Sequence, residues 1–135
     1  MTRTATFAFR LDPRSGVPVY RQLIDQVQAG IASGSLARGE QIPTVRQTAV
    51  DLAINPNTVL RAYRELEIRG ILDTQQGTGT FISDRKAPQD DTERKRQLEQ
   101  LVSEFVARAG GGGFTVKELM DRLREWVPES EKRTK

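Results

Sequence analysis

Residues 54–69 read INPNTVLRAYRELEIR, a stretch that carries a helix start signal followed by two chemically different helix faces. Asn55 can cap a helix, and Pro56 suits the first helical position because its missing N–H costs nothing there and its φ is already helical. Gly70 is a natural stop for such a helix. The sequence therefore predicts a helix that starts at Pro56 and ends before Gly70.

The two faces of this predicted helix carry different side chains. At ~100° per residue, one side collects the apolar residues Val59, Ala62, Tyr63 and Leu66. The opposite side collects mainly polar and cationic residues, namely Asn57, Arg61, Arg64 and Ile68. If the second face binds a partner, that partner should be anionic. For an isolated helix, an ordinary solvated face explains the pattern equally well.

Upstream of this stretch, residues 16–36 predict an earlier helix. Gly34 is its natural stop, and its apolar residues recur at helical spacing, at Val19, Tyr20, Leu23, Ile24, Val27 and Ile31. Before it, residues 7–12 (FAFRLD) alternate loosely in hydropathy and indicate a short extended lead.

A second, short helix is expected between these two. Thr44 can act as its N-cap, and Gln47 follows three residues later, which is a capping-box pattern. The helix should run from about Val45 to Ala53, so that only a tight turn separates it from the helix at Pro56.

Downstream, residues 71–83 (ILDTQQGTGTFIS) predict two short strands around a glycine-bearing turn. We expect four of their side chains to cover a small core: Leu72, Thr74, Phe81 and Ile82. Three helices followed by a hairpin are the elements of a winged helix-turn-helix. The fold class expected for residues 8–84 is therefore mostly α with a small β-hairpin wing.

The C-terminal part, residues 85–135, predicts a helical hairpin. It opens with a polar, charged segment, four glycines at 110–113 interrupt it, and Thr115 with Glu118 forms a second capping-box pattern. Two such helices bury little alone, so their apolar stripes must pack on the first domain or on a second copy. Dimerisation is the expected role of Leu98, Leu101, Val102, Phe105, Leu119, Met120, Leu123 and Trp126.

The composition argues against several functional classes. The 135-residue chain has no cysteine and no histidine, so it lacks thiol nucleophiles, disulfides, and the commonest general base and nitrogen metal ligand. We expect no enzymatic activity, cofactor or metal.

No apolar run approaches the ~20 residues needed to cross a bilayer, and the N-terminus lacks an apolar signal segment. A cytoplasmic protein without a membrane partner is expected.

The net charge of +3 does not by itself predict nucleic-acid binding. Residues 1–84 carry nine basic and eight acidic side chains, so any basic face must come from their placement. All nine cations are arginine, whose planar fork suits phosphate groups and guanine edges.

The helix at Pro56 is the candidate for DNA recognition. In a helix-turn-helix the second helix lies in the major groove, with its N-terminal residues at the base edges. Asn57, Thr58 and Arg61 are then placed to read bases, with asparagine suited to adenine and arginine to guanine. Arg64 lies a turn later and is expected at a phosphate.

Arg46 and the wing supply further candidates. Arg46 and the N–H groups at the start of its helix are expected to face a phosphate, the alternative being an ion pair with Asp51 or Glu40. Gly77 and Gly79 would let the wing backbone approach a sugar-phosphate strand, or simply allow the turn. No Gly-Lys-Ser/Thr follows them, which argues against a nucleotide loop. The candidate DNA-binding residues are Thr44, Arg46, Asn55, Asn57, Thr58, Arg61, Arg64, Gly77 and Thr78.

Residues 18–83 resemble the winged helix-turn-helix of the GntR family of bacterial transcription regulators, with NPNTVLRAYRELE followed by GTGTF as the signature. The short C-terminal helical hairpin resembles the YtrA-type branch. The resemblance implies a homodimer that binds a pseudo-palindromic operator, often near genes for an ABC transporter. The leading hypothesis is a repressor. The resemblance also implies DNA contacts for Arg46, Asn57, Thr58 and Gly77.

This chain departs from the family pattern at several positions. Other branches often have arginine where this chain has Pro56 and Leu60, so those contacts are not transferred. Thr48 stands where leucine is usual, and Gln75 and Gln76 replace a wing that is often basic. About 50 residues remain after Lys86, without histidine, so a metal pocket or roomy effector cavity is not expected, and the sequence identifies no small-molecule effector.

Two other functional classes can be weighed against this reading. A winged-helix module that binds another protein would use the same scaffold, because fold alone does not fix function. An enzyme would need carboxylate or serine chemistry in a pocket that the sequence does not indicate.

Overall fold

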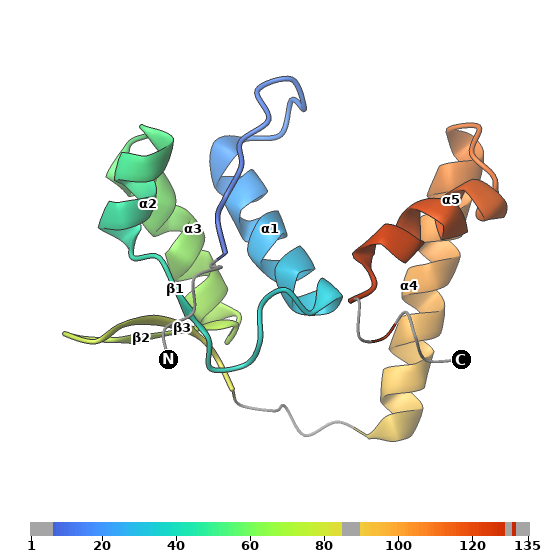
Figure 1. Ribbon diagram of the computed structural model, residues 1–135. Helices are drawn as coiled ribbons and strands as arrows, with labels where there is room; N and C mark the ends of the chain where they lie inside the picture. Colours follow the sequence, from blue (N-terminus) through green and yellow to red (C-terminus); the bar gives the residue numbers. More distant parts are fainter. Residues whose placement is uncertain (1–6, 85–89, 129–130, 132–135) are drawn as a thin grey trace. The chain divides into compact units, whose positions relative to one another are not determined.

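The computed structural model describes residues 7–84, 90–128 and 131, and the chain divides into two units, 1–85 and 86–135. We describe each unit by itself. The first contains three helices and three strands (Figure 1). Their bounds are α1 Val19–Ser33, β1 Gln41–Ile42, α2 Val45–Leu52, α3 Pro56–Ile68, β2 Leu72–Gln75 and β3 Gly79–Ile82.

The core of the first unit lies between its helices, with α3 packed against both α1 and α2 (Figure 1). The side chains that α3 contributes are those predicted from its apolar face, and all are at most 2% exposed: Val59, Ala62, Tyr63 and Leu66. From α1 come Leu23, Ile24 and Val27, each at most 1% exposed. Burying an aliphatic side chain of this size stabilises the fold by about 1.5–3 kcal/mol, so this interface holds α3 firmly in place.

The start of α3 is the one that its sequence predicts. The side-chain oxygen of Asn55 accepts a hydrogen bond from the backbone N–H of Asn57 at 2.8 Å, and Pro56 occupies the first helical position. Only Ala53 and Ile54 separate the end of α2 from this cap, and Ala53 adopts a left-handed conformation with φ 56°. The tight turn between the two helices is therefore confirmed.

The predicted capping box at α2 is only half formed. Thr44 accepts a hydrogen bond from the backbone N–H of Gln47 at 3.1 Å. The side chain of Gln47 instead donates to the carboxylate of Asp51, one helical turn further on, at 2.8 Å. The helix consequently keeps one side-chain cap and gains a side-chain contact along its exposed surface.

The sheet has three strands in the order β1-β3-β2, one more than the sequence predicted. The additional strand β1 pairs antiparallel with β3, with Gln41 opposite Phe81 and Ile42 opposite Thr80. It comprises two residues followed by Pro43, so no alternation in hydropathy could reveal it. Its buried Ile42 links the wing to the helical core.

The hairpin of β2 and β3 is confirmed, but two of the four side chains assigned to its core are not buried. Leu72 and Ile82 face each other across the hairpin and are buried, whereas Thr74 is exposed and Phe81 only half-buried. Successive side chains of a strand point to opposite faces, so Thr80 shares the inner face with Ile82 and Phe81 does not. Thr80 is 5% exposed and takes the expected place of Phe81 in the core.

A buried polar contact joins α2, α3 and the segment between β1 and α2. The Tyr63 hydroxyl donates to the carbonyl oxygen of Pro43 at 2.6 Å and lies 3.1 Å from the Thr48 hydroxyl, which can donate to it. Burial raises the pKa of Tyr63 to about 12, against a smaller lowering by the Thr48 hydrogen bond. Thr48 therefore supplies a hydroxyl partner that a leucine at this position could not.

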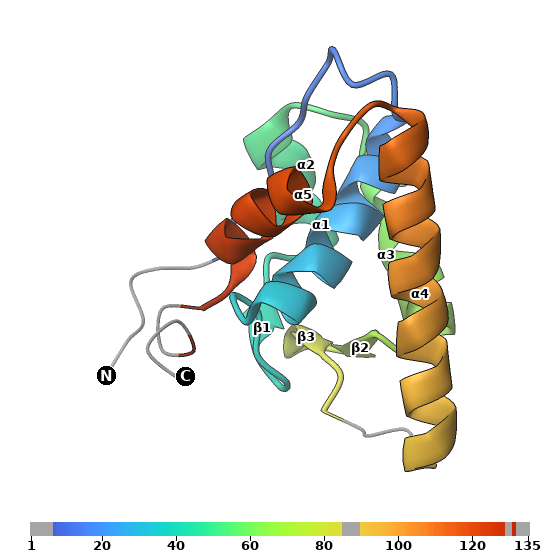
Figure 2. The same cartoon turned by 90° about the vertical axis from the view of Figure 1, so that its right-hand side faces the viewer.

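The second unit contains α4 Asp91–Gly111, α5 Val116–Leu123 and the 3₁₀ turn η1 Arg124–Trp126. The glycine run does not end the helix at its first residue, because α4 continues through Gly110 and ends at Gly111, with Gly112 as its C-cap. Figures 1 and 2 show α5 diverging from α4 after this loop. Residues 85–89, 129–130 and 132–135 of the predicted C-terminal region lie outside the described residues.

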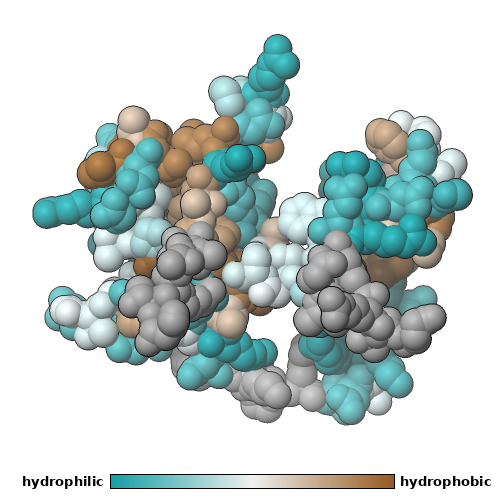
Figure 3. All heavy atoms as spheres, in the orientation of Figure 1, coloured by the Kyte–Doolittle hydropathy of each residue, from teal (hydrophilic) through white to brown (hydrophobic). Residues whose placement is uncertain are grey.

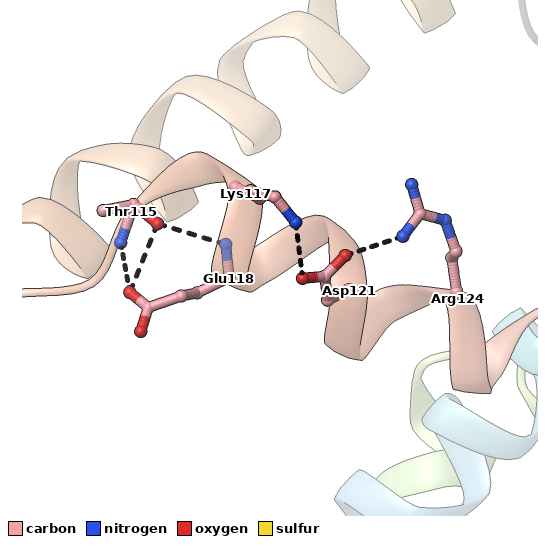
Figure 4. Close-up of polar contacts among 5 residues, drawn as sticks. All are labelled: Thr115, Lys117, Glu118, Asp121 and Arg124. Atoms are coloured by element: carbon pink, nitrogen blue, oxygen red, sulfur yellow. Dashed lines mark hydrogen bonds and ion pairs between the residues drawn. The ribbon is translucent and has the colours of Figure 1, made fainter.

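The start of α5 carries the complete capping box that the sequence predicted (Figure 4). The Glu118 carboxylate accepts the backbone N–H of Thr115 at 2.8 Å, and the Thr115 hydroxyl accepts the backbone N–H of Glu118 at 3.1 Å. Further along, Asp121 pairs with both Lys117 and Arg124. These contacts define one polar side of α5.

The helices formed by residues 7–84 and 90–128 include none that combines the length and the hydropathy needed to span a bilayer.

Candidate DNA-binding surface

The outer face of α3 carries the side chains predicted for it. Asn57, Arg61, Arg64 and Ile68 are all exposed, opposite the buried apolar stripe. A shallow hollow runs along this face, lined by Asn57, Leu60, Arg61, Arg64, Glu65 and Ile68. Within the described part of the chain, the side chains of Asn57 and Arg64 make no hydrogen bond or ion pair. Their donors are therefore free to meet a ligand.

Thr58 and the two capping residues occupy the N-terminal ends of the helices. Thr58 is half-buried, and its backbone N–H donates to the Asn55 carbonyl oxygen at 3.0 Å. Thr44 and Asn55 are exposed, and each uses its side-chain oxygen to accept a capping hydrogen bond. The Thr44 O–H and the Asn55 amide N–H₂ remain available as donors because capping engages only the acceptor side of each group.

Arg61 makes a contact that sequence reasoning missed. Its guanidinium carbon lies over the ring of Tyr20, 3.7 Å from the ring centroid. Tyr20 is the second residue of α1 and is half-buried, packed against the core as the sequence predicted. Helical periodicity describes one helix at a time, so it gave no signal for this cation–π pair between α1 and α3.

Arg46 lies in the first turn of α2 and is exposed. Within residues 7–84 it forms no ion pair with Asp51 or Glu40, the alternative weighed from the sequence. By contrast, Arg69 at the end of α3 is engaged by Glu65 at 3.1 Å and by Gln28 at 2.9 Å. Arg46 therefore presents an unpaired charge beside the N-terminal N–H groups of α2, where an anion is favoured.

The wing turn connects β2 to β3 and contains Gly77 and Thr78. Gly77 has a φ of 77° with open space around it, and the Thr78 N–H closes the turn on the Gln75 carbonyl oxygen at 3.0 Å. Gly79 has a φ of 141°, and the Gln41 amide fills the space that a side chain there would need. The glycines thus serve the turn itself and leave the wing backbone accessible at Gly77.

A second hollow lies apart from the outer face of α3. It has a volume of about 730 Å³ and lies among the N-terminal segment, β1 and α2, with Phe7, Phe9, Gln47, Asp51 and Leu52 in its lining. Apolar residues gather over this part of the first unit in Figure 3. It shares no lining residue with the hollow along α3, so the two are separate surface features.

The apolar residues of the C-terminal unit remain largely exposed. Seven of these residues each have an exposed fraction between 45% and 63%: Leu98, Leu101, Val102, Phe105, Met120, Leu123 and Trp126. Leu119 is half-buried. In Figure 3 brown apolar spheres show between the teal surfaces of this unit. Neither helix of the unit therefore buries its apolar side in the other.

Comparison with known proteins identifies the family. Residues 19–82 match the model of the bacterial regulatory proteins of the gntR family. The HTH-type transcriptional repressor YtrA of Bacillus subtilis (strain 168) is 32% identical over 120 residues, covering 89% of each chain. The HTH-type transcriptional regulator Rv1152 of Mycobacterium tuberculosis is 40% identical over 120 residues, covering 89% of this chain and 93% of the relative.

Solved structures agree with this assignment. The crystal structure of a transcriptional antiterminator from Listeria monocytogenes EGD-e superimposes with a TM-score of 0.67 at 26% identity, covering 90% of this chain and 91% of that one. The winged helix and the C-terminal helices are thus both represented among relatives. The chain belongs to the GntR family and is a DNA-binding transcription regulator, not an enzyme.

Proposed function

We propose that this protein binds a specific DNA operator by placing α3 in the major groove. The observation that carries the proposal is the outer face of α3, where Asn57 and Arg64 present unpaired donors while the opposite side is fixed in the core. B-DNA's major groove admits an α-helix and displays a distinct donor and acceptor pattern for each base pair. A rigid helix with free amide and guanidinium groups is suited to reading that pattern.

The roles follow from the position and chemistry of each side chain. Asn57, in the first turn of α3, can form two hydrogen bonds with adenine, and Arg61 can do so with guanine. Thr58 lies beside them as a smaller hydroxyl contact. Arg64 and Arg46 neutralise phosphates on either side of the groove, and phosphate contacts of this kind set register without reading sequence.

The capping residues and the wing add contacts to the backbone. Thr44 and Asn55 can donate their remaining hydrogens to phosphate oxygens while their oxygens cap α2 and α3. Gly77 and Thr78 bring the wing backbone close to a neighbouring strand. Because Gln75 and Gln76 replace cations, the wing releases few counterions and contributes little to the salt dependence of binding.

A homodimer is the form that we propose for DNA binding. The exposed apolar side chains of α4, α5 and η1, from Leu98 to Trp126, form a set that soluble proteins normally cover. A second copy offers the same set, and a two-fold axis then relates two α3 helices. The operator should consequently be pseudo-palindromic, with half-sites separated by about one helical turn of DNA or a multiple of it.

The proposed regulatory outcome is repression in the cytoplasm. It is supported by the relative YtrA, which is named a transcriptional repressor, and by the family resemblance, which also suggests an ABC transporter operon as the target.

Selection of bound duplexes from a random pool tests the proposal. We expect an enriched site with two related half-sites. We also expect log Kd to rise linearly with the logarithm of the salt concentration, so that binding weakens as salt is added. If no duplex binds in a salt-dependent way, the DNA-binding role is wrong and the winged-helix scaffold serves another partner. Enrichment of one asymmetric half-site would contradict the dimer while keeping the DNA contact.

A further inference from the structure

We propose that Tyr20 is a positioning residue for DNA recognition, which acts by holding the guanidinium of Arg61 at the edge of the major groove. This inference rests on the proposed function of α3. The observation behind it is the cation–π contact of Arg61 with the Tyr20 ring at 3.7 Å, between the first turn of α1 and the outer face of α3.

Tyr20 can act as a fixed platform because its end of α1 is held from several sides. Its side chain packs against the core. The neighbouring Gln22 is 9% exposed, and its amide donates to the carbonyl oxygens of Asp12 and Val17 and to the Ser15 hydroxyl. These bonds tie the chain that precedes α1 to the helix and so hold the backbone that carries Tyr20.

Stacking of this kind leaves the recognition chemistry of Arg61 intact. The hydrogen-bonding N–H groups of a guanidinium lie in its plane, so a ring over one face does not compete for them. The ring does restrict the rotamers that a long, exposed arginine would otherwise sample. Part of the entropy cost of ordering the Arg61 side chain is then met before DNA binds. Arg64 lies on the same face and has no such platform within residues 7–84.

The Tyr20 hydroxyl is dispensable in this scheme. It makes no hydrogen bond to the described residues, and the ring face alone contacts Arg61. Tyr20→Phe should therefore preserve positioning, whereas Tyr20→Leu keeps an apolar but smaller side chain without a π face and should abolish it. Comparing Tyr20→Leu in the wild-type and Arg61→Ala backgrounds then separates the ring's contact with Arg61 from its packing in the core.

The test measures the affinity of Tyr20→Phe, Tyr20→Leu, Arg61→Ala and the double variant Tyr20→Leu/Arg61→Ala for a duplex selected by the wild-type protein. We expect Tyr20→Phe to bind like the wild type and Tyr20→Leu to lose about two- to fivefold, the range typical of an exposed cation–π pair. The loss should disappear in the Arg61→Ala background. Base preference should relax at the same position in Tyr20→Leu and Arg61→Ala.

Three results would overturn the inference. An equal loss from Tyr20→Leu in both backgrounds would assign Tyr20 a general structural role. Tighter binding by Tyr20→Leu would show that the ring withholds Arg61 from DNA. A loss in Tyr20→Phe equal to that in Tyr20→Leu would implicate the hydroxyl. If the wild-type protein binds no duplex, the proposed function itself fails, which is a distinguishable outcome.

A measurement on the free protein covers the case in which Tyr20→Leu does not fold. NMR of the wild type and of Tyr20→Phe should show the Arg61 side-chain signals displaced by the ring current, with slower side-chain motion than those of Arg64. Arg61 signals at random-coil positions, with motion equal to that of Arg64, would contradict the inference without any destabilising variant.

Discussion

The hydroxyl of Tyr63 donates a hydrogen bond to the carbonyl oxygen of Pro43 at 2.6 Å, which fixes α3 to the segment that leads from the sheet into α2. Thr48 bonds the same hydroxyl from within α2. One buried phenol group thus adds polar contacts to the apolar packing between the two helices on which the proposed DNA contacts lie.

Tyr63→Phe should destabilise the protein by about 1–3 kcal/mol, because it removes the hydroxyl and leaves the Pro43 carbonyl oxygen without its donor. The free energy of unfolding from urea titration measures the loss. Thr48→Val is the matched control, since it removes one hydroxyl from the same contact but leaves the Tyr63–Pro43 bond in place, and should cost less. A larger cost for Thr48→Val would contradict the assigned order.

The same residue predicts a pH dependence of stability. Burial raises the pKa of Tyr63 in the folded state from its ordinary value of 10.0 to about 12, so the folded state keeps its proton at pH values where the unfolded chain has lost it. The contribution of this raised pKa to the free energy of unfolding is complete below pH 10. It declines by roughly 1.4 kcal/mol per pH unit as the pH rises towards 12. Subtracting the unfolding free energies of Tyr63→Phe from those of the wild type across this range isolates the effect. A flat difference would refute it.

Arg46→Ala should weaken binding to every duplex and lower the salt slope by ~1, because a phosphate contact carries no sequence information. Arg69→Ala is its matched control: it removes the same charge, but from a side chain already engaged by Glu65 and Gln28. Binding titrations at several salt concentrations measure both variants. Equal changes in slope would show that Arg46 acts through overall charge alone.

Asn57→Ala should cost about 1–3 kcal/mol of binding free energy on the selected operator and relax preference at one base pair. The reason is the loss of a bidentate contact with a base edge. Titration against all single-base variants of the operator gives the measurement. A uniform loss on every variant would place Asn57 at the phosphate backbone instead.

Leu101→Glu should shift the protein towards monomers, because it places a charge within the apolar set that we assign to dimerisation. Leu101 is 63% exposed in the single chain, so the substitution disturbs little within the protomer. Val50→Glu provides the control, as Val50 is 70% exposed on α2 in the other unit. Sedimentation equilibrium reports the mass of each. Unchanged dimers of Leu101→Glu, or dissociation of both variants, would contradict the assignment.

The sequence predicted those parts of the fold that depend on local signals. The cap at Asn55, the proline after it and the apolar period of α3 all lie within one helix, and the structure confirms them. The sequence did not predict the strand at Gln41, because this segment is a strand only through its pairing with β3, far along the chain. The persistence of α4 through Gly110 likewise shows that a weak helix former does not always end a helix.

The candidate site shows the same division. The exposed face of α3 could be predicted from its spacing, but the contact of Arg61 with Tyr20 and that of Tyr63 with Thr48 join residues on different helices. Such pairs depend on how helices pack, for which a single sequence gives no direct signal.

The short strand β1 has a consequence for how DNA would be held. Gln41 donates to the Thr78 carbonyl oxygen in the wing at 3.3 Å, and only three residues later Thr44 caps α2. One phosphate bound by the wing and another bound at the start of α2 would thus contact the two ends of the same four-residue segment, residues 41–44. A displacement of the wing would move the start of α2 through this segment, and the reverse. We therefore expect the wing and α2 to bind and release DNA together.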